Sequence, residues 1–576
     1  GLMNRREFLQ VMAAAYLAGF TNKLSAKNIT NYNHPFSSDI RLLHITDTHA
    51  QLSPSFFREP NINLGTGSNR NVPPHIVGDN FLKYYGLDGN FNKYLYSYIN
   101  FNELAKKYGK FGGYAHLKTA IDHLRNESNG NSLLLDGGDT WQGSAVSLFE
   151  SGRDMVEASN ILGVDVMTGH WEFTFGEDQF IKNIKNFNGE FVANNVFLND
   201  EAIFNDVPSY DDENHYQKPY TIKEVNGKQI AIIGQAFPYT PIANPSRYVS
   251  NLTFGIREQE LQETVDKVKD KYKPALVVVL SHNGIDVDKK LASRVNGIDI
   301  IFGGHTHDAV PKPIIIKNNN GKTLVTNSGC NGKFISFIDI KFSGKSYTYN
   351  YNLLPILSNE VKPNQQMQSF IDSVSNPYKK LLSETIGYAD DTLYRRSNFN
   401  GTFDDLLCDS MNVVLDSEIS LSPGFRWGPS LTPNQPITMS DIYNHTAITY
   451  PNTYVRSMTG ETIKNVLEDV ADNIFNIDPY LQQGGDMVRT RGIKYTINPR
   501  NKMNNRIEKL RLNNDIEIKP DKEYKVSGWA SVNNIEEGKP IWDITKEYLK
   551  AVGTYKVDQS QKIKIINEDG NIGIET

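Results

Sequence analysis

The chain has 576 residues, a net charge of −6 at pH 7 and a sequence pI near 6.1. This charge gives no reason to expect nucleic acid as a partner. Two cysteines, Cys330 and Cys408, are too few for a disulfide framework, and we expect both to be core thiols. A hydrophobic share of 39% and a charged share of 22% are ordinary for a globular protein of two or three domains.

The first residues have the pattern of an export signal. Twin arginines, Arg5 and Arg6, precede Phe-Leu and a short apolar run at 11–20, as in a twin-arginine signal peptide. We expect this signal to span 1–26 and the mature protein to be periplasmic; the alternative is an amphipathic opening helix. The run is too short to span a bilayer, and no other segment is apolar enough, so we expect no membrane span.

From residue 39 the chain alternates strand and helix patterns. Short runs rich in Val and Ile, closed by Gly, Asn or Ser, are typical of buried strands; they lie at 40–46, 132–135, 229–234, 275–281, 298–303 and 322–326. Helical patterns such as 256–272 lie between them. This alternation predicts a layered α/β domain at 39–355.

Three further segments complete the predicted organisation. Residues 52–111 are rich in Asn, Pro, Gly and Tyr, and we interpret them as a long functional insertion over the surface of the domain. A linker at 356–384 contains a helix-like stretch from 364 to 384. A second α/β domain follows at 385–570, where Thr459 is the expected N-cap of a helix.

Several predicted strands are followed directly by residues that can ligate a metal: Asp47, His49, Asp139, His170, His282, His305 and His307. The carboxyl ends of neighbouring strands converge on one crevice in α/β sheets. In an extended strand end, residues i and i+2 point to the same side, so the pairs at 47/49 and 305/307 are expected to chelate. Imidazole and carboxylate without thiolate suit Mn, Zn, Fe or Ni.

The order of these motifs resembles the calcineurin-like metallophosphoesterases, and with the second domain it resembles the 5′-nucleotidase family. The resemblance implies a β-sandwich catalytic domain flanked by helices, followed by a substrate-binding α/β domain. It assigns one metal to Asp47, His49, Asp139 and His307, and the other to Asp139, His170, His282 and His305. Asp139 would bridge the two ions, and a water or hydroxide between them would be the nucleophile.

The chain departs from the nucleotidase pattern where catalysis is assisted. Nucleotidases carry Gly-Asn-His-Glu-Phe-Asp, but here the stretch reads Gly-His-Trp-Glu-Phe-Thr from residue 169. His170 replaces the ligand Asn, Trp171 replaces the catalytic His, and Thr174 replaces the Asp that orients it. In the second domain, residues 537–542 stand where nucleotidases hold the base. With these substitutions the chain resembles the SoxB thiosulfohydrolase family. The stretch Ser-Pro-Gly-Phe-Arg-Trp-Gly at 422–428 is part of the same resemblance.

That resemblance implies an S-sulfosulfanyl-L-cysteine sulfohydrolase of periplasmic thiosulfate oxidation. Its substrate is a cysteine S-thiosulfonate on a SoxYZ-type sulfur carrier, its product is sulfate, and its two metal ions are manganese. The substitutions fit this chemistry, because a thiol has a pKa of about 8.5 and its anion leaves without being protonated. Asp139, His170, Trp171 and Arg426 are the expected catalytic residues.

The anionic end of such a substrate needs positive charge. Arg426 is the first candidate, Arg489 is a weaker one, and Phe425 and Trp427 are expected to line a channel for the carrier arm. Two alternatives remain open. One is a 5′-nucleotidase or cyclic-nucleotide phosphodiesterase, which an assay with adenosine monophosphate decides. The other is a non-catalytic metal-bearing scaffold that docks the carrier, which metal depletion decides.

Overall fold

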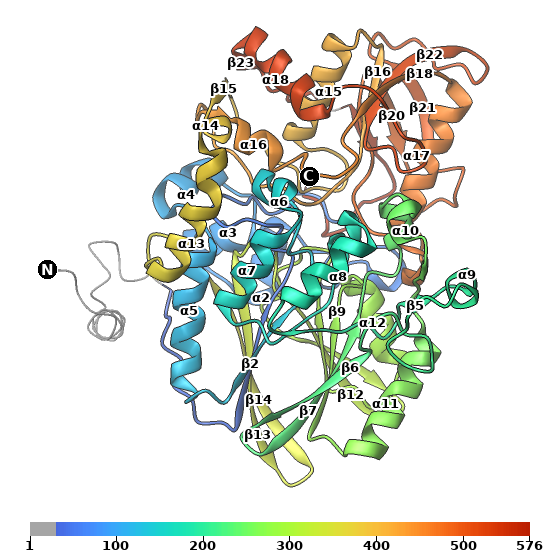
Figure 1. Cartoon of the computed structure of the whole chain (residues 1–576). Coiled ribbons are helices and arrows are strands. Elements are labelled where there is room, and N and C mark those ends of the chain that lie inside the picture. The colour runs from blue at the N-terminus through green and yellow to red at the C-terminus, as the bar shows by residue number, and fades with distance from the viewer. Residues whose placement is uncertain (1–29, 561, 576) are drawn as a thin grey trace, which may run out of the picture.

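The computed structural model describes residues 30–560 and 562–575, so the predicted signal peptide at 1–26 lies outside the described residues. Figure 1 shows a lower part built on two sheets and an upper part formed by the orange and red elements. In the described ranges, no helix has the length and apolarity needed to cross a membrane.

The first sheet of the lower part has the order β14-β13-β1-β2-β3-β4. Four strands run parallel: β1 (Ile40–Ile45), β2 (Ser132–Asp136), β3 (Val166–Met167) and β4 (Glu190–Phe191). A hairpin of β13 (Phe334–Ser343) and β14 (Ser346–Pro355) adds to the free edge of β1 in antiparallel fashion.

The second sheet has the order β11-β12-β10-β9-β7-β6. Its parallel strands are β7 (Lys228–Gln235), β9 (Leu276–Ser281), β10 (Ile300–Gly303) and β12 (Gly321–Asn327). β6 (Tyr220–Val225) and β11 (Ile314–Asn318) flank them antiparallel. Each predicted strand is therefore present, with bounds shifted by at most a few residues.

Both faces of the central strands β1, β9 and β10 are buried, which explains their nearly continuous apolar sequences. Between the sheets, side chains such as Leu42, Leu135, Val278 and Phe302 form one fully buried core. The outer faces pack against helices α5 (Tyr114–Glu127) and α7 (Arg153–Leu162) on one side, and α11 (Glu258–Tyr272) and α12 (Ile285–Arg294) on the other. The parallel strands of both sheets end at the same edge of this sandwich.

The upper part holds three smaller sheets and the helices α15 (Thr402–Val414), α16 (Met439–Tyr443), α17 (Gly460–Phe475) and α18 (Ile541–Val552). The longest of these sheets has the order β18-β22-β16-β19, formed by Thr453–Thr459, Glu523–Trp529, Ile419–Ser422 and Arg489–Arg491. As predicted, Thr459 caps α17, its hydroxyl accepting from the Thr462 amide. The expected fold, a helix-flanked sandwich followed by an α/β domain, is confirmed.

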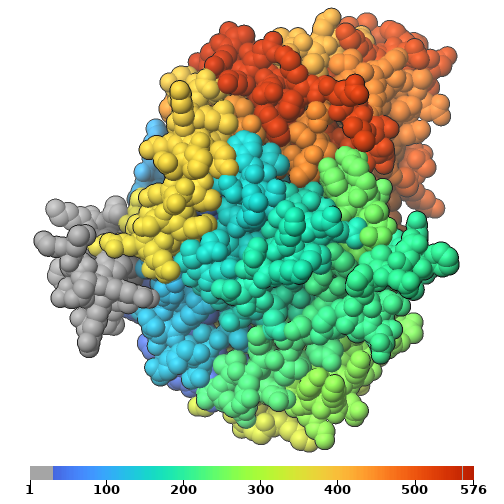
Figure 2. Space-filling view, viewed as in Figure 1, coloured from blue at the N-terminus to red at the C-terminus, as the bar shows by residue number. Residues whose placement is uncertain are grey.

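The linker and the insertion differ from their predictions. The helix expected at 364–384 is divided into α13 (Gln365–Ser375) and α14 (Lys379–Leu382) by a 3₁₀ turn at Asn376–Tyr378, because a proline ring and its missing N–H interrupt an α-helix. Figure 2 shows this yellow segment running along the side of both parts of the molecule.

The insertion at 52–111 is not an irregular surface loop. It contains α2 (Gly78–Tyr85), α3 (Gly89–Tyr96) and α4 (Phe101–Tyr108), and the aromatic residues of α3 and α4 form a core together with Phe334 and Leu357. It also crosses to the upper part, where the Leu64 amide donates to Asn398 Oδ1 at 2.7 Å. The residue before it, Asn63, donates its backbone amide to the Gly573 carbonyl at 2.7 Å. The insertion therefore ties the two parts together.

Candidate metal centre

The loops after the parallel strands carry the candidate ligands in a conformation that the sequence did not predict. Asp47 and His49 after β1 have φ of 52° and 47°, Asp139 after β2 has 56°, and His305 and His307 after β10 have 79° and 63°. These are left-handed values, not extended ones, so the i, i+2 argument was wrong in its geometry. Each costs on the order of 1–2 kcal/mol in a non-glycine residue. Tight turns, not strand ends, aim these side chains.

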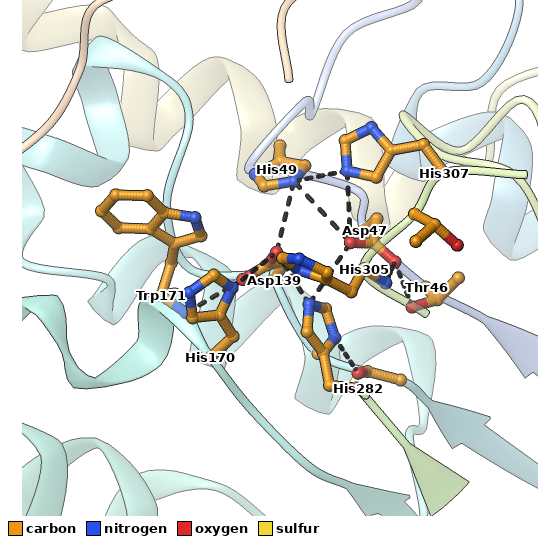
Figure 3. A network of polar contacts seen from close by, with 12 residues as sticks. Thr46, Asp47, His49, Asp139, His170, Trp171, His282, His305 and His307 are labelled. Atoms are coloured by element: carbon orange, nitrogen blue, oxygen red, sulfur yellow. Dashed lines mark hydrogen bonds and ion pairs between the residues drawn. The ribbon is translucent and has the colours of Figure 1, made fainter. Parts of the chain in front are cut away.

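The seven side chains form two groups that share Asp139. In the first group, nitrogens of His170, His282 and His305 and a carboxylate oxygen of Asp139 lie within 4.8 Å of one another. His282 Nε2 is 2.9 Å and His170 Nδ1 is 3.4 Å from Asp139 Oδ2. Figure 3 shows these rings gathered around Asp139.

The second group is Asp47, His49, Asp139 and His307. His49 Nε2 faces His307 Nε2 at 3.2 Å, and His307 Nε2 is 3.3 Å from Asp47 Oδ1. Asp47 and His49 thus lie in the same group, whereas His305 and His307 fall into different groups. The turn between them directs one ring to each side of Asp139.

The charges of the site suit cations. Burial alone would raise the pKa of Asp139, but the imidazoles of His282, His170 and His49 hold it well below its usual value. Burial would lower the pKa of His282, but Asp139 and Asp47 raise it to about 10. The two carboxylates therefore impose a strongly negative field on the ring nitrogens.

Several polar atoms here are buried without a hydrogen-bond partner in the described part of the chain: Asp47 Oδ1, both ring nitrogens of His170, His305 Nε2 and His307 Nδ1. Buried polar atoms are rarely left unpaired in proteins. Imidazole nitrogens and carboxylate oxygens in two such groups fit two divalent cations, and the donor set contains no thiolate. Cys330 and Cys408 are both buried and free, as predicted.

A buried carboxylate fixes the two loops that meet at Asp139. The Glu172 oxygens accept the backbone amides of Asp139, Thr140, Trp141 and His170 at 2.7–3.0 Å. The Trp171 amide donates to Asp139 Oδ1 at 2.9 Å. Glu172 therefore holds the shared carboxylate and the His170 loop as one unit.

A cleft of about 190 Å³ opens onto both groups, between the lower and upper parts. The upper part contributes 423–427, which includes three of the predicted residues: Phe425, Arg426 and Trp427. Trp171 lies beside them, with its ring centroid 5.5 Å from that of Phe425. The predicted aromatic residues and Arg426 are thus brought to the metal groups.

Arg426 is held by an acidic partner. Its Nε lies 3.3 Å from Asp486 Oδ1, and its Nη2 donates to the Gly485 carbonyl at 3.0 Å. Arg396 pairs with the same carboxylate at 3.3 Å. Two guanidinium groups thus converge beside the turn that carries His305 and His307, since both approach the Thr306 carbonyl.

Arg489 does not reach the cleft, which corrects its predicted role at the substrate. Its side chain is 1% exposed and its Nε pairs with Asp404 Oδ2 at 3.0 Å. Its remaining donors go to backbone carbonyls of Arg395, Ser397 and Asn398. These contacts, with Asp486 Oδ2 a further 3.7 Å from Nη2, hold the buried guanidinium within the upper part and away from the cleft.

Several residues of the site were missed by the sequence argument. Phe237 stacks on His305 with centroids 4.0 Å apart, and Gly484 is so close to that ring that a Cβ would lie 1.9 Å from Nε2. Arg396, Asp486 and Glu172 were also missed. The adjacent arginines at 395 and 396 were the one signal that could have found Arg396.

Two family models match the chain. Calcineurin-like phosphoesterase matches residues 40–309, and 5′-nucleotidase, C-terminal domain, matches residues 385–538. Among solved structures, the sulfate thiohydrolase SoxB of Thermus thermophilus superimposes with a TM-score of 0.87 at 31% identity, over 93% of this chain and 98% of that chain. A 5′-nucleotidase precursor, also from Thermus thermophilus, shares the fold, with a TM-score of 0.71 at 20% identity over 92% and 99% of the two chains.

The curated relatives match over less of their own length. The trifunctional nucleotide phosphoesterase YfkN of Bacillus subtilis is 25% identical over 76% of this chain and 33% of that protein. The 5′-nucleotidase of Rattus norvegicus is 27% identical over 52% of this chain and 54% of that protein. The chain therefore spans about a third to a half of these relatives.

The fold, the two groups of candidate ligands and the two family-model matches together show that the chain is a two-domain metal-dependent hydrolase of the 5′-nucleotidase superfamily. Within this superfamily the chain belongs to the SoxB family.

The structural role of Arg489 can be tested by removing its charge. Arg489→Met leaves Asp404 with one fewer buried partner, so we expect the free energy of unfolding to fall by about 3–5 kcal/mol. Urea denaturation measures this loss, and the KM of the folded fraction should stay within about threefold of wild type. An unchanged stability with a strongly raised KM would restore the substrate role.

Proposed function

We propose that the protein is a thiosulfohydrolase that removes the sulfonate from a cysteine S-thiosulfonate on a sulfur carrier and releases sulfate. One observation carries the proposal. At the shared carboxylate of Asp139, the positions of the nucleotidase His and Asp hold Trp171 and Thr174, while Arg426 remains at the cleft. The likeness to the sulfate thiohydrolase SoxB supports the same substrate class.

The residues proposed to hold two divalent ions, most favourably manganese, are Asp47, His49, Asp139, His170, His282, His305 and His307. Divalent ions held there would supply Lewis-acid chemistry, lowering the pKa of a bound water to about 7. The chain orients the ligands through Glu172, and through a hydrogen bond of His282 Nδ1 to the Gly137 carbonyl at 2.6 Å. With the proton held on Nδ1 by that bond, Nε2, which lies 2.9 Å from Asp139 Oδ2, would offer its lone pair to an ion.

The leaving group explains why no imidazole acid is needed. Water adds to the sulfonate sulfur, the bond between that sulfur and its neighbouring sulfane sulfur breaks, sulfate is released, and the carrier cysteine keeps a persulfide anion. The two protons of the water pass to solvent. A thiol-type anion of pKa near 8.5 leaves unprotonated, so a general acid worth about 10²–10⁴-fold can be absent. In agreement, Thr174, which stands where nucleotidases have the Asp that orients the catalytic His, pairs its Oγ1 with Thr449 Oγ1 at 2.8 Å.

Arg426 is proposed to bind the sulfonate oxygens. Its side chain is 11% exposed at the cleft and is steadied by Asp486, so its remaining N–H groups need little reorganisation to meet an oxyanion. Trp171, Phe425 and Trp427 are proposed to surround the carrier arm and exclude water from it.

We further propose that the catalytic domain spans 39–355, the linker 356–384 and the C-terminal domain 385–570. The carrier is proposed to be of the SoxYZ type, and the location to be the periplasm. Arg5 and Arg6 support export by the twin-arginine route.

Substrate preference tests the proposal. Manganese-loaded protein should release sulfate from a thiosulfonate-loaded carrier at least about 100-fold faster, by kcat/KM, than it releases phosphate from adenosine monophosphate. Ion chromatography of sulfate and a phosphate assay measure the two rates. Equal or faster nucleotide hydrolysis would identify a nucleotidase instead, and no release from either would favour a scaffold.

Arg426 gives a second test. Because the guanidinium faces the developing charge, Arg426→Met should lower kcat/KM for sulfate release by about 10²–10³-fold, as loss of an oxyanion donor does. Arg511→Met, which removes a half-buried arginine that pairs with the exposed Asp515 far from the cleft lining, serves as the control and should stay within about twofold. A loss below about threefold at position 426 would contradict the assignment.

A further inference from the structure

A glutamine links one candidate ligand to the other domain. Gln142 lies in the loop after β2, three residues beyond Asp139, and is 2% exposed. Its Oε1 is 3.1 Å from His49 Nδ1, and its backbone oxygen is 3.2 Å from the same nitrogen. On its other side, Gln142 Nε2 donates to the carbonyl of Ala447 in the upper part at 3.1 Å.

The Ala447 carbonyl decides which way the Gln142 amide faces. A carbonyl only accepts, so the NH₂ group of the amide must point toward Ala447. Oε1 is then turned to His49 Nδ1, where the backbone oxygen of Gln142 is a second acceptor. Two acceptors at Nδ1 require the proton to be on Nδ1.

This tautomer leaves His49 Nε2 with its lone pair free. In Figure 3 that nitrogen faces Asp47, Asp139 and His307, with distances of 3.9, 3.6 and 3.2 Å to their nearest ligand atoms. A metal-binding histidine needs this form, and the acceptor on its other nitrogen fixes the ring and raises its basicity.

The loop that carries Ala447 is firmly held. Its His445 ring stacks on Phe403 with centroids 3.6 Å apart, and His445 Nε2 lies 2.6 Å from the Pro429 carbonyl. The same loop approaches the His49 turn a second time. Gln51 Nε2 donates to the His49 carbonyl at 3.1 Å and lies 3.4 Å from Asn444 Oδ1.

We propose that Gln142 is a positioning residue through which the C-terminal domain sets the tautomer and orientation of His49, so that the second metal group is complete only when the two domains are docked. The upper part contributes none of the seven candidate ligands, yet it determines how one of them binds. This inference rests on the proposed metal role of His49. It concerns the group of Asp47, His49, Asp139 and His307, and not the group around His170.

Manganese titration of the metal-free full chain tests this. Gln142→Met fills the same space without hydrogen bonds, and Gln142→Asn keeps the amide but shortens its reach. Thr449→Val is the matched control, because it removes a different contact of the same loop across the boundary, the 2.8 Å bond to Thr174. Calorimetry measures both affinities, and electron paramagnetic resonance at two equivalents reports whether the ions are spin-coupled. Thermal melting of the metal-free variants checks the fold.

We expect Gln142→Met and Gln142→Asn to weaken one of the two manganese equivalents by about 10–100-fold. The affinity for the other manganese equivalent should change by less than about threefold. At two equivalents, the electron paramagnetic resonance signal of uncoupled manganese should replace that of the spin-coupled pair. Thr449→Val should keep both affinities. Unchanged binding in the Gln142 variants, equal weakening at both sites, or the same loss in Thr449→Val would overturn the inference. If the wild type binds fewer than two ions, the proposed function itself fails, a result distinct from these.

Discussion

The structure depends on one shared carboxylate. Asp139 Oδ2 lies within 2.9–3.6 Å of nitrogens of His282, His170 and His49, and it is the one residue common to both ligand groups. A buried carboxylate in this position is tolerated only beside positive charge, and the same negative field attracts divalent cations. The fold can be understood as the means of holding this group between five imidazoles.

Both sheets and both domains contribute to that purpose. One sheet supplies Asp47, His49, Asp139 and His170, and the other supplies His282, His305 and His307, because their parallel strands end at the same edge. Glu172 offsets part of the strain in the left-handed turn at Asp139 through four amide hydrogen bonds in and around it. The C-terminal domain then closes the cleft with Arg426 and its aromatic neighbours. Trp171 stands where the nucleotidase pattern has an imidazole, and we propose that this suits a substrate whose leaving group needs no acid.

Local patterns predicted the sandwich strands and all seven side chains of the two groups, since apolar runs closed by turn residues report buried strands directly. Three features lay beyond such patterns. The left-handed turns at Asp47 and His305 depend on tertiary contacts that no propensity describes. The insertion at 52–111 folds into helices because it buries aromatic side chains against one another and against Phe334 and Leu357. Arg489 and Arg426 look alike in sequence, and only packing sends the first to Asp404 and the second to the cleft.

Anomalous diffraction from manganese-loaded crystals tests the central claim most directly. The account predicts two manganese peaks per chain, about 3.5–4 Å apart. One carboxylate oxygen of Asp139 should lie between them, with His170, His282 and His305 on one ion and Asp47, His49 and His307 on the other. A single peak, or two peaks that do not share Asp139, would contradict it.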